Sequence, residues 1–322
     1  MKKNQHILSC LHIAIMCWLV PGTLAAQEIV PLWPPGKMPN SRGLSLADSI
    51  ANERLYVVGT PKLRAFFPSS AETSGAAVLI CPGGGYVRTA YVTSGLQLAK
   101  WFNTLGVSAF VLDYRLPNSP DVLQREIAPL QDAQRAMRLL RAHAAEWNIS
   151  PSRIGVMGIS AGGHLATTLG TREEDVAAIG DSVDKLPYKP NFMILVSPVI
   201  TMGELTHVGS RTALLGDHPS AELIAKYSNE LHVTASTPPA FIVHAFDDKA
   251  VPVQNSLMFY EALVAKHDSS TLHVFPRGGH SIALRNNPGS TQLWTRLCEE
   301  WMLEMGFLTP PDEKREGNAK SR

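Results

Sequence analysis

Three residues of this sequence, Ser160, Asp248 and His280, have the side-chain types that nucleophilic acyl transfer requires. A serine hydroxyl is a poor nucleophile at neutral pH, so it needs a base such as histidine to take its proton. The histidine in turn needs a carboxylate that holds its tautomer and stabilises its cation. Together, Ser160 would attack an ester carbonyl, His280 would act as general base and general acid, and Asp248 would orient His280.

Ser160 lies in a Gly-Ile-Ser-Ala-Gly segment between an apolar run and an Ala/Leu-rich run. The run from Ile154 to Ile159 predicts a buried strand, and Ala161 to Leu169 predicts a helix. A strand, a sharp turn and a helix around G-x-S-x-G are typical of a nucleophile elbow, in which glycines allow close packing around a strained serine. The alternative is a chance match, because this short motif also occurs in unrelated chains.

The partners of the serine have to be chosen, because the chain contains 11 histidines and two adjacent aspartates. We choose His280 because it follows the last predicted strand, behind a Gly-Gly pair that permits a close approach. His164 is expected to pack on the helix after the serine, and His244 lies within a strand and is expected in the core. Asp248 is preferred to Asp247 because it precedes Lys-Ala-Val-Pro, a turn into the next predicted helix.

A glycine-rich loop could supply the donors that stabilise an oxyanion. The apolar strand predicted over Ala76 to Cys81 ends in Pro-Gly-Gly-Gly-Tyr. Glycines at this place let backbone N–H groups turn toward one point, and we expect Gly84 and Gly85 to form an oxyanion hole with the N–H of Ala161. The alternatives are a flexible turn or a phosphate loop, although the Walker and G-x-G-x-x-G spacings are absent.

Strands alternate with helices along most of the chain, which predicts an α/β fold with a mostly parallel sheet and helices on both faces. The proposed site residues all fall in loops after strands, where such folds carry their chemistry. The pattern weakens over 201–239, which we interpret as a small insertion over the site. The predicted strands are 55–58, 63–67 (both as edge strands), 76–81, 107–112, 154–159, 192–196, 240–246 and 272–275, and the predicted helices are 94–105, 127–147, 161–169, 221–227, 253–266 and 293–305.

Composition narrows the possible partners. The net charge is +1 and 45% of the 322 residues are hydrophobic, so neither a nucleic acid nor an anionic membrane surface is indicated. No histidine and cysteine cluster has metal-ligand spacing, and we expect no metal and no cofactor. Outside the N-terminal segment only Cys81 and Cys298 remain. Two buried, unpaired thiols are preferred to a disulfide between them.

Both ends of the chain are expected to lie outside the folded domain. The N-terminal pattern predicts a secretory signal peptide over 1–26. Two lysines, Lys2 and Lys3, precede an apolar stretch from Ile7 to Val20, and a pair of small residues, Ala25-Ala26, follows as the expected cleavage site. An uncleaved anchor helix is the alternative, although the apolar run is short for a membrane span. The domain is expected over 27–308. The charged segment 309–322 is predicted to be a disordered tail, and the protein to be periplasmic or secreted.

The motifs together resemble those of the α/β-hydrolase superfamily. The order serine, aspartate, histidine is the order of its triad. More narrowly, the chain is similar to secreted bacterial carbohydrate esterases related to acetylxylan esterases and to the feruloyl-esterase-like (BD-FAE) domain. The segments that carry this resemblance are Pro31-Leu32-Trp33-Pro34, Pro82-Gly83-Gly84-Gly85-Tyr86, Asp113-Tyr114-Arg115-Leu116, Gly158-Ile159-Ser160-Ala161-Gly162-Gly163-His164, Asp248-Lys249-Ala250-Val251-Pro252 and Gly279-His280-Ser281.

The resemblance implies hydrolysis of short acyl esters, mainly acetyl groups, on a plant polysaccharide such as xylan. The implied partner is therefore an acylated oligo- or polysaccharide, and a signal peptide agrees with a polymer that is met outside the cytoplasm. Release of ferulate is one alternative, and a serine peptidase of the prolyl-oligopeptidase type is another. A non-catalytic binding module on the same fold is a third, although every triad position here is filled.

Overall fold

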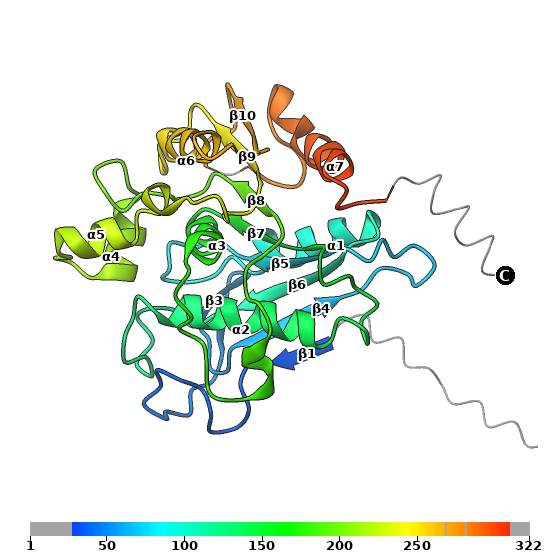
Figure 1. The fold of residues 1–322 in the computed structure, drawn as a ribbon. Coiled ribbons are helices and arrows are strands. Elements are labelled where there is room, and N and C mark those ends of the chain that lie inside the picture. The colour runs from blue at the N-terminus through cyan, green and yellow to red at the C-terminus, as the bar shows by residue number, and fades with distance from the viewer. Residues whose placement is uncertain (1–27, 268, 281, 310–322) are drawn as a thin grey trace, which may run out of the picture.

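An eight-stranded, mostly parallel sheet forms the centre of the computed structural model, which describes residues 28–309 apart from 268 and 281. The predicted signal peptide and the segment 310–322 of the predicted tail lie outside the described residues. The strand order is β1-β4-β6-β5-β7-β8-β9-β10 (Figure 1). The strands are β1 (Glu28–Pro31), β4 (Lys62–Phe66), β5 (Ala77–Cys81), β6 (Ser108–Asp113), β7 (Ile154–Ile159), β8 (Met193–Val196), β9 (Ala240–Ala245) and β10 (Thr271–Phe275).

Strands β5 to β10 pair in parallel, whereas β4 pairs antiparallel with both β1 and β6. The central strands are buried on both faces, which explains their uninterrupted apolar sequences. Their carboxyl ends meet at one edge of the sheet. The loops that carry the predicted site residues leave the sheet at this edge.

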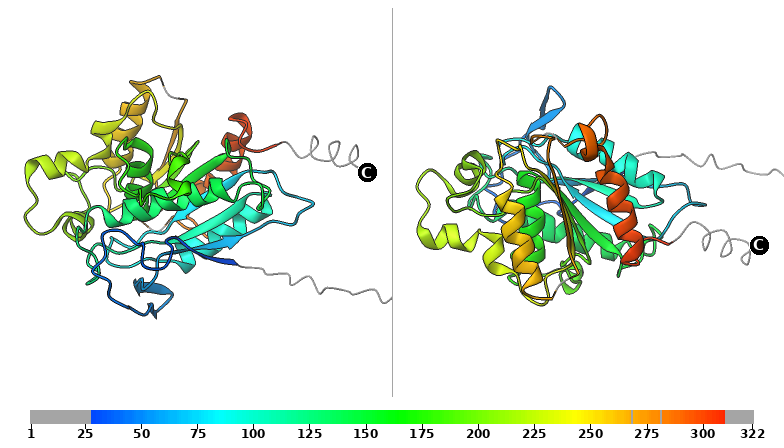
Figure 2. Two further views of the ribbon diagram at one scale, coloured as in Figure 1. Left: turned by 60° about the horizontal axis from the view of Figure 1, so that its bottom comes forward. Right: turned by 90° about the horizontal axis from the view of Figure 1, so that it is seen from above.

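Helices cover both faces of the sheet. The core on one face contains residues of α2 (Ala128–Ala142), α3 (Ala161–Thr171) and α6 (Gln254–Val264). The core on the other face contains residues of α1 (Gln97–Thr104) and α7 (Trp294–Glu304). The right-hand view of Figure 2 shows α6 and α7 on opposite sides of the strands. This α/β-hydrolase arrangement confirms the predicted fold class.

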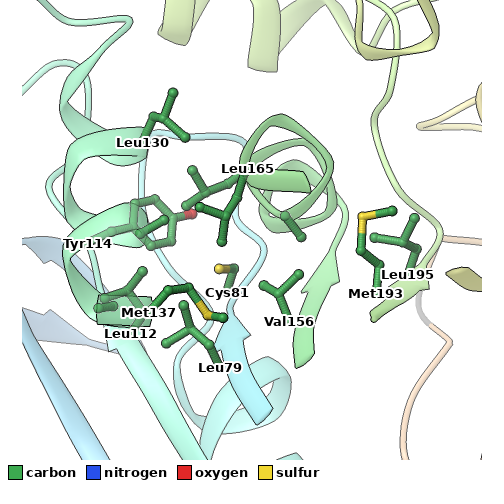
Figure 3. Packing of buried hydrophobic residues seen from close by; sticks show 14 of the residues in the cluster. Leu79, Cys81, Leu112, Tyr114, Leu130, Met137, Val156, Leu165, Met193 and Leu195 are labelled. Atoms are coloured by element: carbon green, nitrogen blue, oxygen red, sulfur yellow. The ribbon is translucent and has the colours of Figure 1, made fainter. Parts of the chain in front are cut away.

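In the core on the face covered by α2, α3 and α6, side chains of alternate strand residues pack against the helices. Figure 3 shows Leu79 and Cys81 of β5 and Val156 of β7 in this core, together with Leu165 of α3. Cys81 and Cys298 are both buried and unpaired, and they lie in the cores on opposite faces of the sheet. The preference for two separate thiols is therefore confirmed. Burial raises the pKa of each thiol well above its usual value, so neither is a nucleophile at neutral pH.

One of the two expectations about edge strands is wrong. The strand predicted over 63–67 is β4, an internal strand that pairs with β1 from Lys62 to Ala65 and with β6 on its other side. The segment 55–58 lies in β3 (Arg54–Val57), which pairs with β2 (Ser49–Ala51) in a separate two-stranded hairpin. The short strand β1 is not predicted from the sequence, because Pro31 and the prolines after it indicate proline-rich, extended chain without a pairing partner.

Two predicted helices are shorter than expected. The prediction over 94–105 divides into a π-helical turn, η1 (Val92–Leu96), and α1. The prediction over 127–147 includes α2 and a following stretch of turns, because the apolar spacing continues beyond the last α-helical residue. The other predicted helices match α3, α5 (Ala221–Lys226), α6 and α7 within a few residues.

The segment 201–239 contains α4 (Val208–Leu215), α5 and a 3-10 turn, η3 (Asn229–His232), between strands β8 and β9. The weak pattern in the sequence did not predict α4. A further 3-10 turn, η2 (Ser182–Lys185), precedes β8, and another, η4 (Gly289–Leu293), precedes α7. Across the part of the chain that the structure describes, no helix has both the length and the apolarity needed to span a bilayer.

Candidate active site

Ser160 sits on a strained turn between β7 and α3. Its φ of 55° and ψ of −122° lie in a region that non-glycine residues rarely adopt. The turn is tightly packed, because a Cβ atom on Gly158 would lie 2.3 Å from the carbonyl oxygen of Gly162. A Cβ on Gly162 would lie 2.0 Å from the carbonyl oxygen of Cys81. The two motif glycines therefore permit the backbone approach that the elbow requires.

The structure brings Ser160, His280 and Asp248 into one hydrogen-bonded chain. His280 Nε2 lies 2.8 Å from Ser160 Oγ, and His280 Nδ1 lies 2.7 Å from Asp248 Oδ2. The three side chains come from the loops after β7, β10 and β9, respectively. With Asp248 accepting the proton of Nδ1, Nε2 is left to accept the proton of the serine hydroxyl.

The surroundings of Asp248 stabilise its ionised carboxylate. Its burial opposes the charged form, but hydrogen bonds from His244, His280 and the N–H of Val251 outweigh this cost and hold the pKa of Asp248 well below its usual range. Its other oxygen accepts the N–H groups of Ala250 and Val251, both at 2.9 Å. The turn after Asp248, which was the reason for preferring it to Asp247, thus supplies two backbone N–H donors to its carboxylate.

Asp247 has a different place in the structure. Its Oδ1 accepts the N–H of Gly279 at 2.7 Å, immediately before His280. This contact ties the loop after β9 to the loop after β10. Asp247 can therefore position the histidine loop, whereas Asp248 contacts the imidazole itself.

His244 is buried, as expected for a strand residue, but it also contacts the carboxylate of Asp248. Its Nε2 lies 3.0 Å from the carbonyl oxygen of Val251 and 3.3 Å from Asp248 Oδ2. Its Nδ1 lies 2.7 Å from Ser256 Oγ. Because a carbonyl only accepts, Nε2 carries a proton that is shared between the two oxygens. This further donor to Asp248 is not predicted from the sequence, because alternation along a strand indicates burial and not a polar contact.

His164 does not join the Ser160 chain. Its Nε2 donates to the carbonyl oxygen of Tyr227 at 2.8 Å, so its Nδ1 accepts the hydroxyl of Tyr86 at 2.9 Å. Burial lowers the pKa of His164 to about 4, which keeps the ring neutral. His164 therefore links the elbow helix to the glycine-rich loop, through Tyr86, and to the chain after α5, through Tyr227.

The glycine-rich loop after β5 packs directly on the nucleophile. A Cβ on Gly83 would lie 2.8 Å from the carbonyl oxygen of Ile159 and 3.2 Å from Ser160 Cβ. Gly84 and Gly85 have φ values of 141° and 65°, which favour glycine. Among the described residues, none of the hydrogen bonds is donated by the N–H of Gly84, Gly85 or Ala161. These N–H groups are available to an oxyanion.

A cavity of about 700 Å³ lies over Ser160. Its wall includes the glycine-rich loop, the first turns of the η1–α1 segment, part of α4 and the loop after β10. The lining residues are Arg54, Gly83, Gly84, Gly85, Val87, Arg88, Ala90, Thr93, Ser94, Gln97, Ile159, Ser160, His207, Gly209, His280, Ile282 and Ala283. Gly83, His207 and the two arginines were not assigned to the site from sequence.

His207, at the N-terminus of α4, has a fixed tautomer in this wall. Its Nδ1 accepts the backbone N–H of Ser210 at 3.2 Å, so the proton of the neutral ring is on Nε2. Burial and the nearby His280 lower the pKa of His207. The cavity therefore gains a neutral N–H donor from the 201–239 segment.

Within the described part of the chain, no group of three or more histidine, cysteine, aspartate or glutamate side chains could hold a metal ion. The chemistry that the described side chains support is proton transfer and nucleophilic attack by a serine. The order of Ser160, Asp248 and His280 along the chain predicts their roles. The contacts of Asp247, His207 and His244 depend on tertiary packing, which the sequence does not indicate.

Comparison with known proteins agrees with the α/β fold of the structure and assigns the chain to a family. The family model of BD-FAE matches residues 63–263. The chain is 35% identical over 255 residues to a protein named acetylxylan esterase from Xylanibacter ruminicola, covering 77% of this chain and 48% of that protein. It is 36% identical over 211 residues to a protein named endo-1,4-beta-xylanase B from Butyrivibrio fibrisolvens, covering 65% of this chain and 33% of that protein. It therefore spans between a third and a half of the length of these two relatives.

A solved structure agrees with the family assignment. The acetyl ester-xyloside bifunctional hydrolase from Caldicellulosiruptor lactoaceticus is 36% identical and superimposes with a TM-score of 0.74. The match covers 88% of this chain and 97% of that one. The resemblance drawn from the motifs is thereby confirmed, and the chain belongs to the BD-FAE family within the α/β-hydrolase superfamily.

Proposed function

We propose that this protein is a serine esterase that removes short acyl groups, above all acetyl, from a plant polysaccharide such as xylan. The observation that carries the proposal is the Ser160–His280–Asp248 hydrogen-bonded chain at the cavity. Membership of the BD-FAE family and relatives named for acetylxylan and xylan support the substrate class. The reaction needs no cofactor.

The proposed first step forms an acyl-enzyme. Ser160 Oγ attacks the ester carbonyl carbon while His280 Nε2 takes the hydroxyl proton, and the carbonyl oxygen becomes an oxyanion. The N–H groups of Ala161, Gly84 and Gly85 donate to this oxyanion, and one such donor is typically worth about 3 kcal/mol in the transition state. The intermediate then collapses, His280 gives its proton to the departing sugar oxygen, and the ester bond breaks.

The second step releases the acid. Water loses a proton to His280 Nε2 and attacks the acyl carbon bound to Ser160, with the same N–H donors on the oxyanion. The proton returns to Ser160 Oγ as the acid leaves. Asp248 remains ionised throughout, because the hydrogen bonds described above lower its pKa, and it stabilises the imidazolium of His280 in both steps.

The test of this function is product release from a polymer that carries two different esters. Acetylated, feruloylated arabinoxylan is incubated with the protein and with the Ser160→Ala variant, and free acetate and ferulate are measured. We expect acetate from the protein and none above background from the variant. Ferulate without acetate would replace the proposed acyl group, and release of neither product would overturn the proposed substrate.

We also propose that the protein acts after export across the inner membrane, in the periplasm or outside the cell. The basic and apolar pattern of residues 1–26 supports this proposal. Expression of the full chain in a bacterium, followed by N-terminal sequencing of the product, tests it. We expect the mature product to begin at or next to Gln27, and an intact N-terminus in the cytoplasmic fraction would contradict export.

A further inference from the structure

The cavity over Ser160 is cationic. Its positive charge comes from two lining arginines, Arg54 and Arg88. No aspartate or glutamate of the described residues is part of its lining. At about 700 Å³ the cavity also has far more room than an acetyl group occupies. The remaining space and the excess positive charge point to a feature of the substrate beyond the acyl group.

The two arginines are held at the same wall of the cavity. The β2–β3 hairpin docks on the glycine-rich loop through paired hydrogen bonds between Leu55 and Thr89, both at 2.9 Å. Leu55 is fully buried at this junction, and Arg54 precedes it. The N–H of Arg88 donates to the carbonyl oxygen of Gly84 at 3.3 Å. The hairpin thus places Arg54 beside the loop that carries Arg88 and the oxyanion donors.

Within 28–309, leaving aside 268 and 281, neither guanidinium group has an acidic partner. Among the described residues, Arg54 and Arg88 form no ion pair, and the only side-chain hydrogen bond donated by either goes from Arg54 to the carbonyl oxygen of Asn52, at 3.3 Å. Other arginines of this chain have carboxylate partners within 3 Å, namely Arg64, Arg115, Arg135 and Arg138. An arginine without a partner in a cavity retains its donors for a ligand, and its planar fork suits a carboxylate.

We propose that Arg54 and Arg88 bind a carboxylate of the substrate, and that the substrate is an acyl ester on an acidic, uronate-bearing sugar chain. The inference rests on the proposed function, because it places the sugar part of that ester in the cavity. Uronates are the common anionic groups of plant polysaccharides, which favours this source of carboxylate. The unpaired positive charge also attracts an anionic chain to the site before contact, an effect that salt weakens.

Binding to the inactive Ser160→Ala protein tests the inference without any turnover. Calorimetry compares a deacetylated xylo-oligosaccharide that carries one glucuronate with the same oligosaccharide after reduction of the carboxyl to an alcohol. We expect the acidic form to bind about tenfold more tightly at low salt, and the difference to shrink as salt is added. Equal affinities for the two forms would overturn the inference.

Arginine variants identify the residues responsible. In the Ser160→Ala background, Arg54→Gln with Arg88→Gln should abolish the preference for the acidic form, and each single change should reduce it. Lys100→Gln is the matched control, because Lys100 is exposed on α1 and is absent from the cavity lining, and it should leave the preference unchanged. Thermal unfolding verifies that each variant is folded. A preference that survives the double change would contradict the assignment.

The source of the carboxylate is distinguished by small esters. A naphthyl succinate ester carries its carboxylate on the acyl side, whereas the oligosaccharide carries it on the alcohol side. Faster arginine-dependent cleavage of the succinate ester than of naphthyl acetate, with no preference between the two oligosaccharides, would overturn the sugar assignment. Failure of acetate release from arabinoxylan is a separate result, since the calorimetric comparison does not depend on it.

Discussion

At the scale of single residues, the site depends on how each polar group is oriented. His280 bridges Ser160 and Asp248 with both ring nitrogens, and Asp248 receives further donors from His244 and from the backbone. These contacts fix the tautomer of His280 and the charge of Asp248 before a substrate arrives. Pre-organisation of this kind costs no rearrangement at the moment of reaction.

The two adjacent aspartates should differ sharply when they are changed. In Asp248→Asn, the remaining side-chain oxygen stays on the N–H groups of Ala250 and Val251, and the amide NH2 faces His280 Nδ1 in place of an acceptor. We therefore expect kcat to fall by about 10⁴-fold, the loss typical of a wrong tautomer. Asp247→Asn is the matched control, because the hydrogen bond that Asp247 forms within the described part of the chain is with the backbone N–H of Gly279, and we expect at most about a tenfold loss. Steady-state hydrolysis of naphthyl acetate measures both. A larger loss in the Asp247 variant would reverse the assignment.

His207 should affect binding more than chemistry. Its Nε2–H is a neutral donor at the cavity wall, and we expect it to donate to the bound substrate, so His207→Ala should remove one hydrogen bond. We expect KM for acetylated oligosaccharide to rise up to about tenfold with little change in kcat, in line with the free energy of one hydrogen bond. Ser210→Ala is the control, because the backbone N–H of Ser210 still fixes the tautomer, and its KM should change less. A loss confined to kcat would contradict this role.

At the scale of elements, the site is assembled from loops that follow three parallel strands and from a glycine-rich loop after a fourth. The β2–β3 hairpin is docked on that fourth loop through Leu55 and Thr89. His164 ties the same loop to the elbow helix through Tyr86. The position of the oxyanion donors therefore depends on contacts from three different parts of the chain.

Gly83 gives a direct test of this packing. Gly83→Ala would place a methyl group 2.8 Å from the carbonyl oxygen of Ile159, so the glycine-rich loop must move away from Ser160. We expect kcat to fall by about 10²-fold or more, because the oxyanion donors move with the loop. Gly203→Ala is the control, since its added Cβ meets a side-chain hydroxyl at 3.2 Å and not a backbone atom. Unchanged kcat in the Gly83 variant would show that the loop does not hold the oxyanion.

Much of this arrangement could be predicted from sequence because it follows from local patterns. Apolar runs identified the parallel strands, and the elbow motif placed Ser160 between β7 and α3. The choice of His280 and Asp248 used only their positions after strands, and the structure places His280 beside Ser160 and Asp248 beside His280. These features need no knowledge of which segments pack together.

The features that were missed depend on tertiary contacts. The strand β4 was expected at an edge because nothing local reveals that Glu28–Pro31 pairs with it. The hairpin becomes part of the site through docking of Leu55, the one buried residue of β2 and β3, and its sequence does not indicate this contact. The roles of His207 and His244 similarly come from partners close to them in space, which alternation of polar and apolar residues does not indicate.

At the scale of the whole molecule, a buried neutral histidine links the site to the stability of the fold. The folded-state pKa of His164 is about 4, below the ordinary value of 6.5. Between these two values the unfolded chain binds a proton at His164 that the folded protein does not bind. The free energy of unfolding therefore falls as the pH is lowered through this interval, by about 3 kcal/mol in total.

Urea unfolding at pH values across this interval tests the linkage. We expect the wild-type protein to lose stability steeply below pH 6.5, and His164→Gln, although less stable at neutral pH, to have a shallower dependence. His218→Gln is the control, because His218 is exposed, and its pH dependence should match that of the wild type. An equally steep dependence in the His164 variant would show that other groups cause the acid sensitivity.

The central claim is that an acyl group passes through Ser160, and mass spectrometry of the acylated peptide tests it most directly. The protein is mixed with acetylated xylo-oligosaccharide, quenched in acid within the first turnovers, digested and analysed, with Ser160→Ala treated in the same way. We predict an added acetyl mass on the peptide that contains Ser160 and none in the variant. Acetate release without any acetylated Ser160, or with undiminished rate in Ser160→Ala, would contradict the account.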